Sequence, residues 1–359
     1  MASLNLLVIV CLGYVALLFA VAFVADRAAA TRGGAWLRSP LIYTLSLSIY
    51  ATAWTFYGAV GYAARSGLEF VTIYLGPTLV MIGWWWGLRK LVRIGRSQRV
   101  TSIADLISSR YGKSNTLAIC VTLLAVIGVT PYIALQLQSI TLSFATFAEA
   151  DPNNSYSESA SVIWVAAGLA IFAILFGTRN LDANERHHGV VTAVALEAVV
   201  KLVALLAVGI FVVWGLAGGV GPTMARIDAS PIGQWQVDSA RWATITFLAA
   251  AAFVCLPRMF QVMVVENDDE RHLRVAAWAF PLYLLLISLF VVPIAAVGLD
   301  LLPKGENPDL FVLTLPLSQG REGLAMLSFL GGFPSASSWR WGRFTISCQA
   351  AERRWRLSG

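Results

Sequence analysis

Charged side chains are scarce in this sequence. Only 13% of its 359 residues are Asp, Glu, Lys or Arg, whereas 58% are hydrophobic. A soluble domain carries about 25% charged residues and about 45–50% apolar ones. Because so few polar side chains cannot cover a water-facing surface of this size, the composition predicts an integral membrane protein and excludes a soluble domain.

Histidine and cysteine are also rare, and their positions argue against metal or redox chemistry. Two of the three histidines are the neighbours His187 and His188, which do not face the same way on a helix or strand and make a poor shared metal site. The four cysteines are scattered, without the spacing of a metal or disulfide framework. We therefore expect no metal centre and no redox chemistry, and we assign no catalytic residues. No enzyme activity is expected of this chain; a membrane enzyme that uses His187, His188 or the acidic turn after 265 is the alternative.

The net charge of +6 does not indicate a nucleic-acid partner, because membrane proteins gather Lys and Arg in their cytoplasmic loops. The loop between the first two apolar runs holds three arginines, and seven basic residues lie between positions 89 and 113. The later loop "EADPNNSYSESA" has no Lys or Arg. This alternation predicts a multi-pass protein with its N-terminus outside.

Long apolar runs are what the sequence has in abundance. Each interior run approaches or exceeds the ~17–25 residues that cross a bilayer as a helix. A helix satisfies its own backbone polar groups in lipid, so an all-α polytopic fold is expected. The windows lie at 4–24, 40–62, 69–88, 116–137, 162–177, 190–216, 243–264 and 276–298, and a ninth begins near 323.

Prolines interrupt several of these runs. Proline removes a backbone donor and bends a helix, and broken helices present freed backbone groups to solutes and ions in transporters. Ordinary proline kinks in membrane helices are the alternative. The interrupted segments read "YLGPTL", "GVTPYIALQL", "VCLPRMF", "AFPLY" and "VVPIA".

Two opposite charges lie inside the sixth apolar run. In "TAVALEAVVKLVALL", Glu197 and Lys201 are four residues apart and so share one face of a helix. Charges buried in a membrane usually face the bundle interior and pair with each other. The pair predicts either a self-neutralising packing contact or part of a solute or ion path.

A dense charged stretch, "ENDDERHLR" at 266–274, separates the last two complete runs. Its "ERHLR" loosely resembles the phospho-accepting box of sensor kinases, but here the residues enter a membrane span instead of a long helix in water. We therefore predict a cytoplasmic turn in which Glu and Asp side chains pair with Arg271 and Arg274.

Six segments, which together are spread over most of residues 40–332, are distinctive. They read "YTLSLSIYATAWTFYGAVG", "IYLGPTLV", "RVTSIADLISSRYGKSNTLA", "VTPYIALQLQSI", "RHHGVVTAVALEAVVKLVAL" and "VVENDDERHLRVAAWAFPLYLLLISLFVVPIA". These segments resemble the solute:sodium symporter family, and within it the N-terminal membrane module of certain bacterial sensor histidine kinases.

The resemblance implies a LeuT-like inverted-repeat helical bundle in the bacterial inner membrane, with about 8–9 of the family's roughly thirteen spans. It implies a module for transporting or sensing a small organic solute, such as histidine or another amino acid. On this interpretation kinase domains and a response regulator belong only to full-length relatives. The alternative is a stand-alone sodium-coupled transporter of an amino acid or similar solute.

The resemblance also implies which residues line the solute and ion path. The second run corresponds to the family's first core helix, whose centre is unwound, and "CLPRMFQ" to a second broken helix. Sodium, if it couples, is expected near Ala51 and Trp54; proline transporters of the family carry an aspartate where Tyr50 aligns here. Together with Glu197 and Lys201, the candidate path residues are Ala51, Trp54, Thr55, Gly58, Pro257 and Arg258.

The end of the sequence departs from the family pattern. After "AMLSFLGGF" it continues as "PSASSWRWGRFTISCQAAERRWRLSG", rich in Trp, Arg and Ser. We expect residues 1–332 to form a partial symporter-like domain and 333–359 an atypical basic tail, produced by truncation or an altered reading frame near Phe333.

Overall fold

The computed structural model describes residues 4–29, 37, 39–98, 100–149, 188–267 and 269–333. Throughout these ranges the regular elements are helices, as the composition predicts. The expected span at 162–177 and the tail beyond Phe333 lie outside the described residues, so the domain boundary stays a prediction.

The helices of the first half are α1 (Leu4–Ala29), α2 (Pro40–Ser46), η2 (Leu47–Tyr50), η3 (Trp54–Gly58), α3 (Ala59–Ser66), η4 (Gly67–Phe70), α4 (Val71–Gly83), α5 (Trp85–Ser97), α6 (Ile103–Arg110) and α7 (Asn115–Glu149). Those of the second half are α9 (His188–Ile210), η5 (Phe211–Leu216), α10 (Val220–Ala229), α11 (Ser239–Cys255), α12 (Pro257–Phe260), η6 (Gln261–Val265), α13 (His272–Ser288), α14 (Val291–Leu301), η7 (Pro308–Leu310), α15 (Phe311–Ser318) and α16 (Glu322–Gly332).

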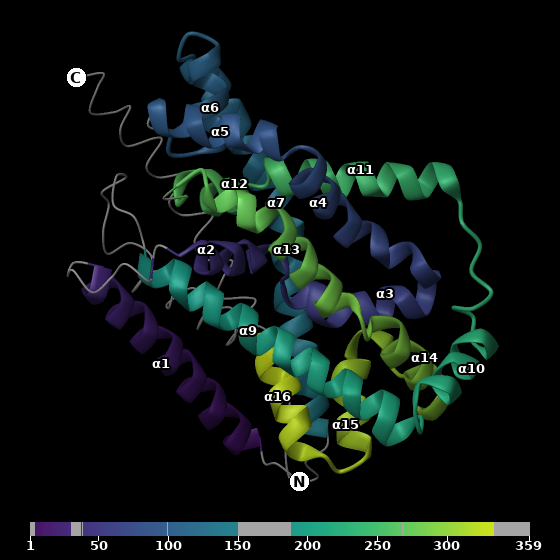
Figure 1. The fold of residues 1–359 in the computed structure, drawn as a ribbon. Helices are drawn as coiled ribbons and strands as arrows, with labels where there is room; N and C mark the ends of the chain where they lie inside the picture. Colours follow the sequence, from purple (N-terminus) through teal and green to yellow (C-terminus); the bar gives the residue numbers. More distant parts are fainter. Residues whose placement is uncertain are drawn as a thin grey trace.

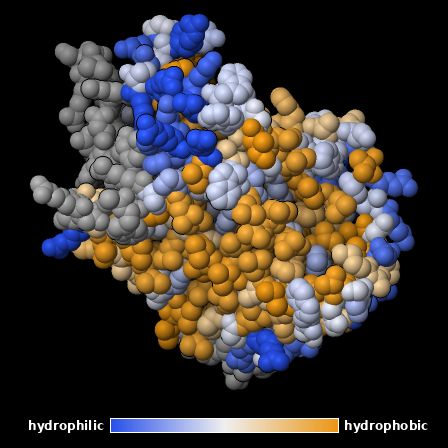
Figure 2. All heavy atoms as spheres, viewed as in Figure 1, coloured by the Kyte–Doolittle hydropathy of each residue, from blue (hydrophilic) through white to orange (hydrophobic). Residues whose placement is uncertain are grey.

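Among the described residues, five helices are long and apolar enough to cross a membrane, or six if the bent pair α11 and α12–η6 is one span. Figure 1 shows α1 and α9 side by side, with α16 against the other end of α9. An apolar belt covers much of the visible face, with hydrophilic residues gathered above and below it (Figure 2). Phe247 and Leu124 are 72% and 70% exposed, which suits side chains that face lipid rather than water.

The first broken helix interrupts the apolar window at 40–62. The helix begins at Pro40, where the side chain of Ser39 caps the N–H of Ile42, and η2 ends at Tyr50. Ala51 then takes an extended backbone conformation, with φ −81° and ψ 95°. Helical structure resumes at Trp54 and continues through η3, α3, η4 and α4 to Gly83 as one membrane-capable stretch. The expected spans at 40–62 and 69–88 are therefore wrong, because the chain breaks at Ala51 instead of between them.

The second broken helix lies where the sequence "CLPRMF" predicts one. Leu256 is extended, with φ −63° and ψ 128°, and the two halves meet at 54°. Residues before a proline are driven out of the helical conformation, which explains the break at this point. In contrast, Pro77, Pro131 and Pro281 lie inside continuous helices, and Pro293 lies in the first turn of α14. There the alternative of ordinary, tolerated prolines is the one that holds.

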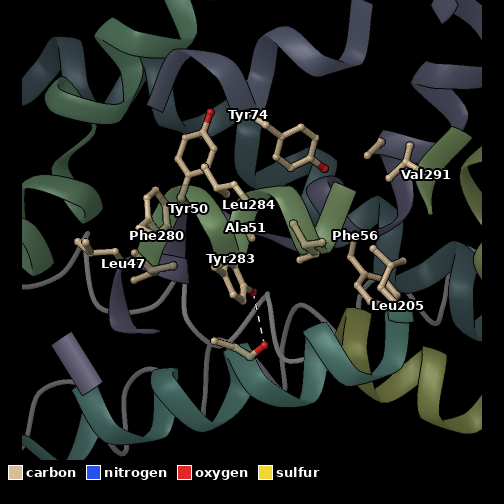
Figure 3. Close-up of a cluster of buried hydrophobic side chains, with 14 of the residues drawn as sticks. Leu47, Tyr50, Ala51, Phe56, Tyr74, Leu205, Phe280, Tyr283, Leu284 and Val291 are labelled. Atoms are coloured by element: carbon tan, nitrogen blue, oxygen red, sulfur yellow. Dashed lines mark hydrogen bonds between the residues drawn. The ribbon is translucent and has the colours of Figure 1, made fainter. Parts of the chain in front are cut away.

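An aromatic cluster joins both broken helices to α13. Figure 3 shows Tyr50, Phe280 and Tyr283 gathered beside the first break. Phe253 of α11 meets Tyr50 edge-to-face at 5.7 Å and stacks on Phe280 at 5.5 Å. The hydroxyl of Tyr283 donates to the Ala198 carbonyl of α9 at 3.4 Å (Figure 3). The core therefore holds the broken helix against α9 and α13.

One end of the molecule carries the arginine-rich helix α5, with α6 and the acidic turn around Asn267 and Glu270 beside it; we call it the basic end after α5 (Figure 1, upper left). Glu270 in this turn pairs with Arg89 at 2.9 Å and Arg93 at 3.1 Å. Arg96 donates to the carbonyl of the buried Asn267 at 2.8 Å. The expected pairing of Glu270 within its own turn is wrong, because α5 supplies the arginines.

The pH dependence of this contact follows from its geometry. Hydrogen bonds from Arg89 and Arg93 lower the pKa of Glu270 from 4.5 to about 2. The stabilisation is therefore complete above the unfolded-state pKa and is lost as the pH falls from about 4.5 towards 2. We expect Glu270→Gln to lower the thermal unfolding midpoint at pH 7, and the difference from wild type to vanish in strong acid.

The control for this prediction is Glu306→Gln, which changes an exposed carboxyl in the loop after α14. It is expected to leave the midpoint unchanged at both pH values. A Glu270→Gln deficit that persists at pH 2 would show that the side chain acts through packing rather than through its charge.

Candidate functional site

The break in the first helix frees backbone groups, and three side chains bind them. The N–H of Thr52 donates to the hydroxyl of Thr55 at 3.2 Å. The N–H of Trp54 donates to the side-chain carbonyl of Gln136 at 3.2 Å. The carbonyl of Ala51 accepts a hydrogen bond from the ammonium of Lys201. Because buried backbone groups need partners, these contacts stabilise the break.

Lys201 and Glu197 form the ion pair that their spacing on α9 predicts. Lys201 Nζ lies 3.1 Å from Glu197 Oε1, and the side chains are 2% and 5% exposed. The ammonium therefore bridges Glu197 to the carbonyl of Ala51 and ties α9 to the broken helix. The structure confirms that the pair is self-neutralising, while its part in a solute or ion path stays a prediction.

A cavity of about 270 Å³ is lined by four elements. These are the two broken helices together with α4 and α7. Most of its wall is apolar or aromatic, with a single charged side chain. This composition is typical of small-molecule sites, which combine an apolar wall with a few polar groups. The lining residues are Tyr50, Trp54, Thr55, Ile73, Gly128, Val129, Tyr132, Ala252, Leu256, Pro257 and Arg258.

Arg258 is the charged residue of the cavity, and it is only 8% exposed. Its guanidinium donates to the hydroxyl of Tyr132 at 3.0 Å and lies 4.5 Å from the centre of the Tyr132 ring. The Tyr132 hydroxyl also bonds to the hydroxyl of Thr52 at 2.5 Å. Because Tyr132 accepts from Arg258, its own proton can be donated to Thr52.

The guanidinium of Arg258 has no carboxylate within ion-pair distance among the residues that the structure describes. Its Nε is buried and makes no hydrogen bond there. A buried charge is costly unless it is paired. The described surroundings of the break thus hold two cations, Arg258 and Lys201, against one carboxylate, Glu197.

The structure separates the predicted site residues into two groups. Trp54, Thr55, Pro257 and Arg258 line the cavity together. Ala51, Glu197 and Lys201 form the ion-pair contact. Gly58 belongs to neither group: a Cβ there would lie 2.9 Å from the Trp54 ring, so this glycine leaves room for that side chain.

Sequence analysis did not single out Tyr132 and Gln136 of α7, which are central to the site. Both lie in the segment "VTPYIALQLQSI", from which only an interruption at the proline was predicted. Their spacing of four residues on one helix places them on one face, and this was the signal available. Their partners Thr52 and Trp54 lie 80 and 82 residues away in sequence.

The residues near Ala51 and Trp54 do not fit a sodium ion. Freed backbone carbonyls hold such ions in broken transporter helices, but here the carbonyl of Ala51 is bound to an ammonium group. At Trp54 the freed group is an N–H, which binds Gln136 and cannot be a metal ligand. We therefore derive no step of the function through sodium at this position.

Removing the Gln136 amide tests the account of the break. Gln136→Leu leaves the partly buried N–H of Trp54 without its side-chain partner, and an unsatisfied donor of this kind costs up to about 1–3 kcal/mol. We expect a lower free energy of unfolding in detergent, measured by circular dichroism during denaturant titration. The control is Gln138→Leu, on the exposed side of the same helix, which should change the free energy of unfolding little. Equal losses in the two variants would show that the Gln136 amide does not stabilise the break.

Comparison with known proteins gives a similar protein that is named as a symporter. No family model matches this chain. The chain is 24% identical over 298 residues to a Bacillus subtilis (strain 168) protein named "Uncharacterized symporter YhjB", a match that covers 80% of this chain and 57% of that protein. The chain thus spans little more than half the length of this relative. With the membrane-capable helices, the similarity supports a multi-pass membrane protein.

Proposed function

We propose that this chain is a symporter-type membrane module that takes a small organic carboxylate into the cavity between its two broken helices. The observation that carries the proposal is Arg258, a buried guanidinium in the cavity wall without a carboxylate partner among the described residues. Arginine recognises carboxylates through two parallel hydrogen bonds. A bound carboxylate would supply the missing counter-charge.

The rest of the cavity wall indicates the body of the solute. Tyr50, Trp54 and Tyr132 provide aromatic surface, and Ile73, Val129 and Leu256 provide apolar surface. The volume of about 270 Å³ suits a molecule of amino-acid size. Histidine or another amino acid with a ring or apolar side chain is therefore the solute class that we propose.

Uptake by reconstituted vesicles tests this function. Vesicles that contain the purified chain and are preloaded with one unlabelled amino acid should transiently accumulate the same labelled amino acid from outside. We expect at least one member of a panel that includes histidine and proline to accumulate above protein-free vesicles. Accumulation at the protein-free level for every member would contradict transport.

The finer proposal is that the module belongs to a membrane sensor histidine kinase in the bacterial inner membrane, with its N-terminus outside. It is supported by the resemblance of the quoted segments and by the contacts of the basic end. There the turn that follows the second broken helix is joined to α5 through Glu270 and Asn267, which offers a route from the cavity to the cytoplasmic side. A stand-alone transporter of an amino acid is the alternative.

Signalling and transport predict different results for a longer version that carries kinase domains. Solute-dependent phosphorylation with little flux would favour the sensor. Flux without any effect on phosphorylation would favour the stand-alone transporter.

A further inference from the structure

The ammonium of Lys201 occupies an unusual position for a membrane cation. It lies against the carbonyl of Ala51, which the helix break removes from ordinary helical hydrogen bonding. Lys201 is 1% exposed and Ala51 is fully buried. The same ammonium lies 3.1 Å from Glu197 Oε1, so it has one charged and one neutral oxygen partner.

These two oxygens are the donors that a small alkali cation also uses. A freed backbone carbonyl and a carboxylate form an oxygen-lined cation position, and such carbonyls coordinate ions in broken helices. An ammonium is a compact point charge with three hydrogen-bond donors. A metal ion at hydrogen-bond distance from the Ala51 carbonyl would face this like charge in a medium of low dielectric constant.

A packing ion pair alone does not explain the contact with Ala51. Glu197 and Lys201 could neutralise each other along α9 without reaching any other helix. Instead the lysine side chain crosses to the break, where 150 residues separate it from its second partner. Arg258 is connected to the other side of the same break through Tyr132 and Thr52, so cationic side chains hold both sides.

We propose that Lys201 is a tethered cation that takes the place of a metal ion at the Ala51 carbonyl. Glu197 fixes the direction of its ammonium, and the ammonium holds α9 against the broken helix. The module therefore needs no sodium at this position to keep the break folded. The inference deepens the proposed transport function by defining the cation of the site, but its test involves no solute.

The test measures sodium binding by the full purified chain. Binding of radioactive sodium is followed in a scintillation proximity assay, and thermal unfolding is compared in sodium chloride and choline chloride at equal concentration. The wild type is expected to show no saturable sodium binding and equal unfolding midpoints in the two salts. Saturable binding by the wild type would overturn the proposal.

The variant Lys201→Ala removes the ammonium and leaves Glu197 facing the Ala51 carbonyl. It is expected to gain saturable sodium binding, and sodium should raise its unfolding midpoint where choline does not. The double variant Glu197→Met with Lys201→Met, which has neither charge, is the control and should show neither effect. A folded Lys201→Ala protein without gained binding would overturn the proposal; if this variant does not fold, the wild-type measurement decides.

Failure of this proposal is distinguishable from failure of the proposed function. Sodium binding is measured without any organic solute, so an amino-acid panel without uptake leaves the ion result intact. Conversely, a wild type that binds sodium in saturable fashion can still accumulate a carboxylate.

Discussion

Arg258→Gln is expected to weaken binding of the carboxylate solute by about 10- to 100-fold. The substitution removes a charge-assisted contact, and hydrogen bonds to charged groups contribute about 1.5–3 kcal/mol, where each 1.4 kcal/mol is about tenfold in affinity. The measurement is calorimetric titration of the amino acid that the chain takes up most strongly. The affinity of Arg258→Lys should lie between those of the wild type and Arg258→Gln, because lysine keeps the charge but loses the planar pair of donors.

The control for this prediction is Arg274→Gln. Arg274 is an exposed arginine near the start of α13 and does not line the cavity. Its substitution should leave the affinity within error of the wild type. If Arg258→Gln binds as tightly as Arg274→Gln, the carboxylate is not held by Arg258.

The second large effect concerns the buried pair of α9. Glu197→Met or Lys201→Met alone leaves one uncompensated charge in the interior, which costs about 3–5 kcal/mol. Replacing both residues by Met removes the charges together and is expected to restore part of the stability, because well-packed apolar groups substitute for buried ion pairs at little cost. The Ala51 carbonyl still loses the ammonium that binds it, so the double variant remains less stable than the wild type. The measurement is the free energy of unfolding in detergent, without sodium.

The pattern across the three variants is the decisive part of this prediction. The double variant is expected to be more stable than either single variant. If the loss of stability in the double variant equals the sum of the losses in the two single variants, the residues act through separate contacts rather than as a pair.

Local sequence pattern predicted those features of this protein that depend on neighbouring residues. The pairing of Glu197 with Lys201 follows from a spacing of four on a helix, and the break at Leu256 follows from Pro257. Apolar length predicted most of the membrane-capable helices because it matches a bilayer, but it did not predict that the windows at 40–62 and 69–88 divide at Ala51 instead. Arg258 was singled out by the family resemblance rather than by local pattern, and the structure places it in the cavity wall.

Contacts between distant residues could not be predicted in this way. The break at Ala51 contains no proline; it is stabilised by Lys201 and Gln136, which lie 150 and 82 residues away from their partners. Glu270 pairs with arginines 177 and 181 residues away rather than with its neighbours. Conversely, Pro131 leaves α7 continuous, because membrane helices tolerate proline when other groups satisfy the freed backbone.

The most direct test of the account compares two solutes that differ only in the carboxylate. L-histidine and its decarboxylated amine, histamine, are titrated into the purified wild-type chain and into Arg258→Gln. The account predicts that the wild type binds the carboxylate at least about tenfold more tightly than the amine, a difference of about 1.4 kcal/mol, and that Arg258→Gln removes this preference. Equal binding of both solutes by the wild type, or a preference that survives in Arg258→Gln, would contradict a carboxylate site at Arg258.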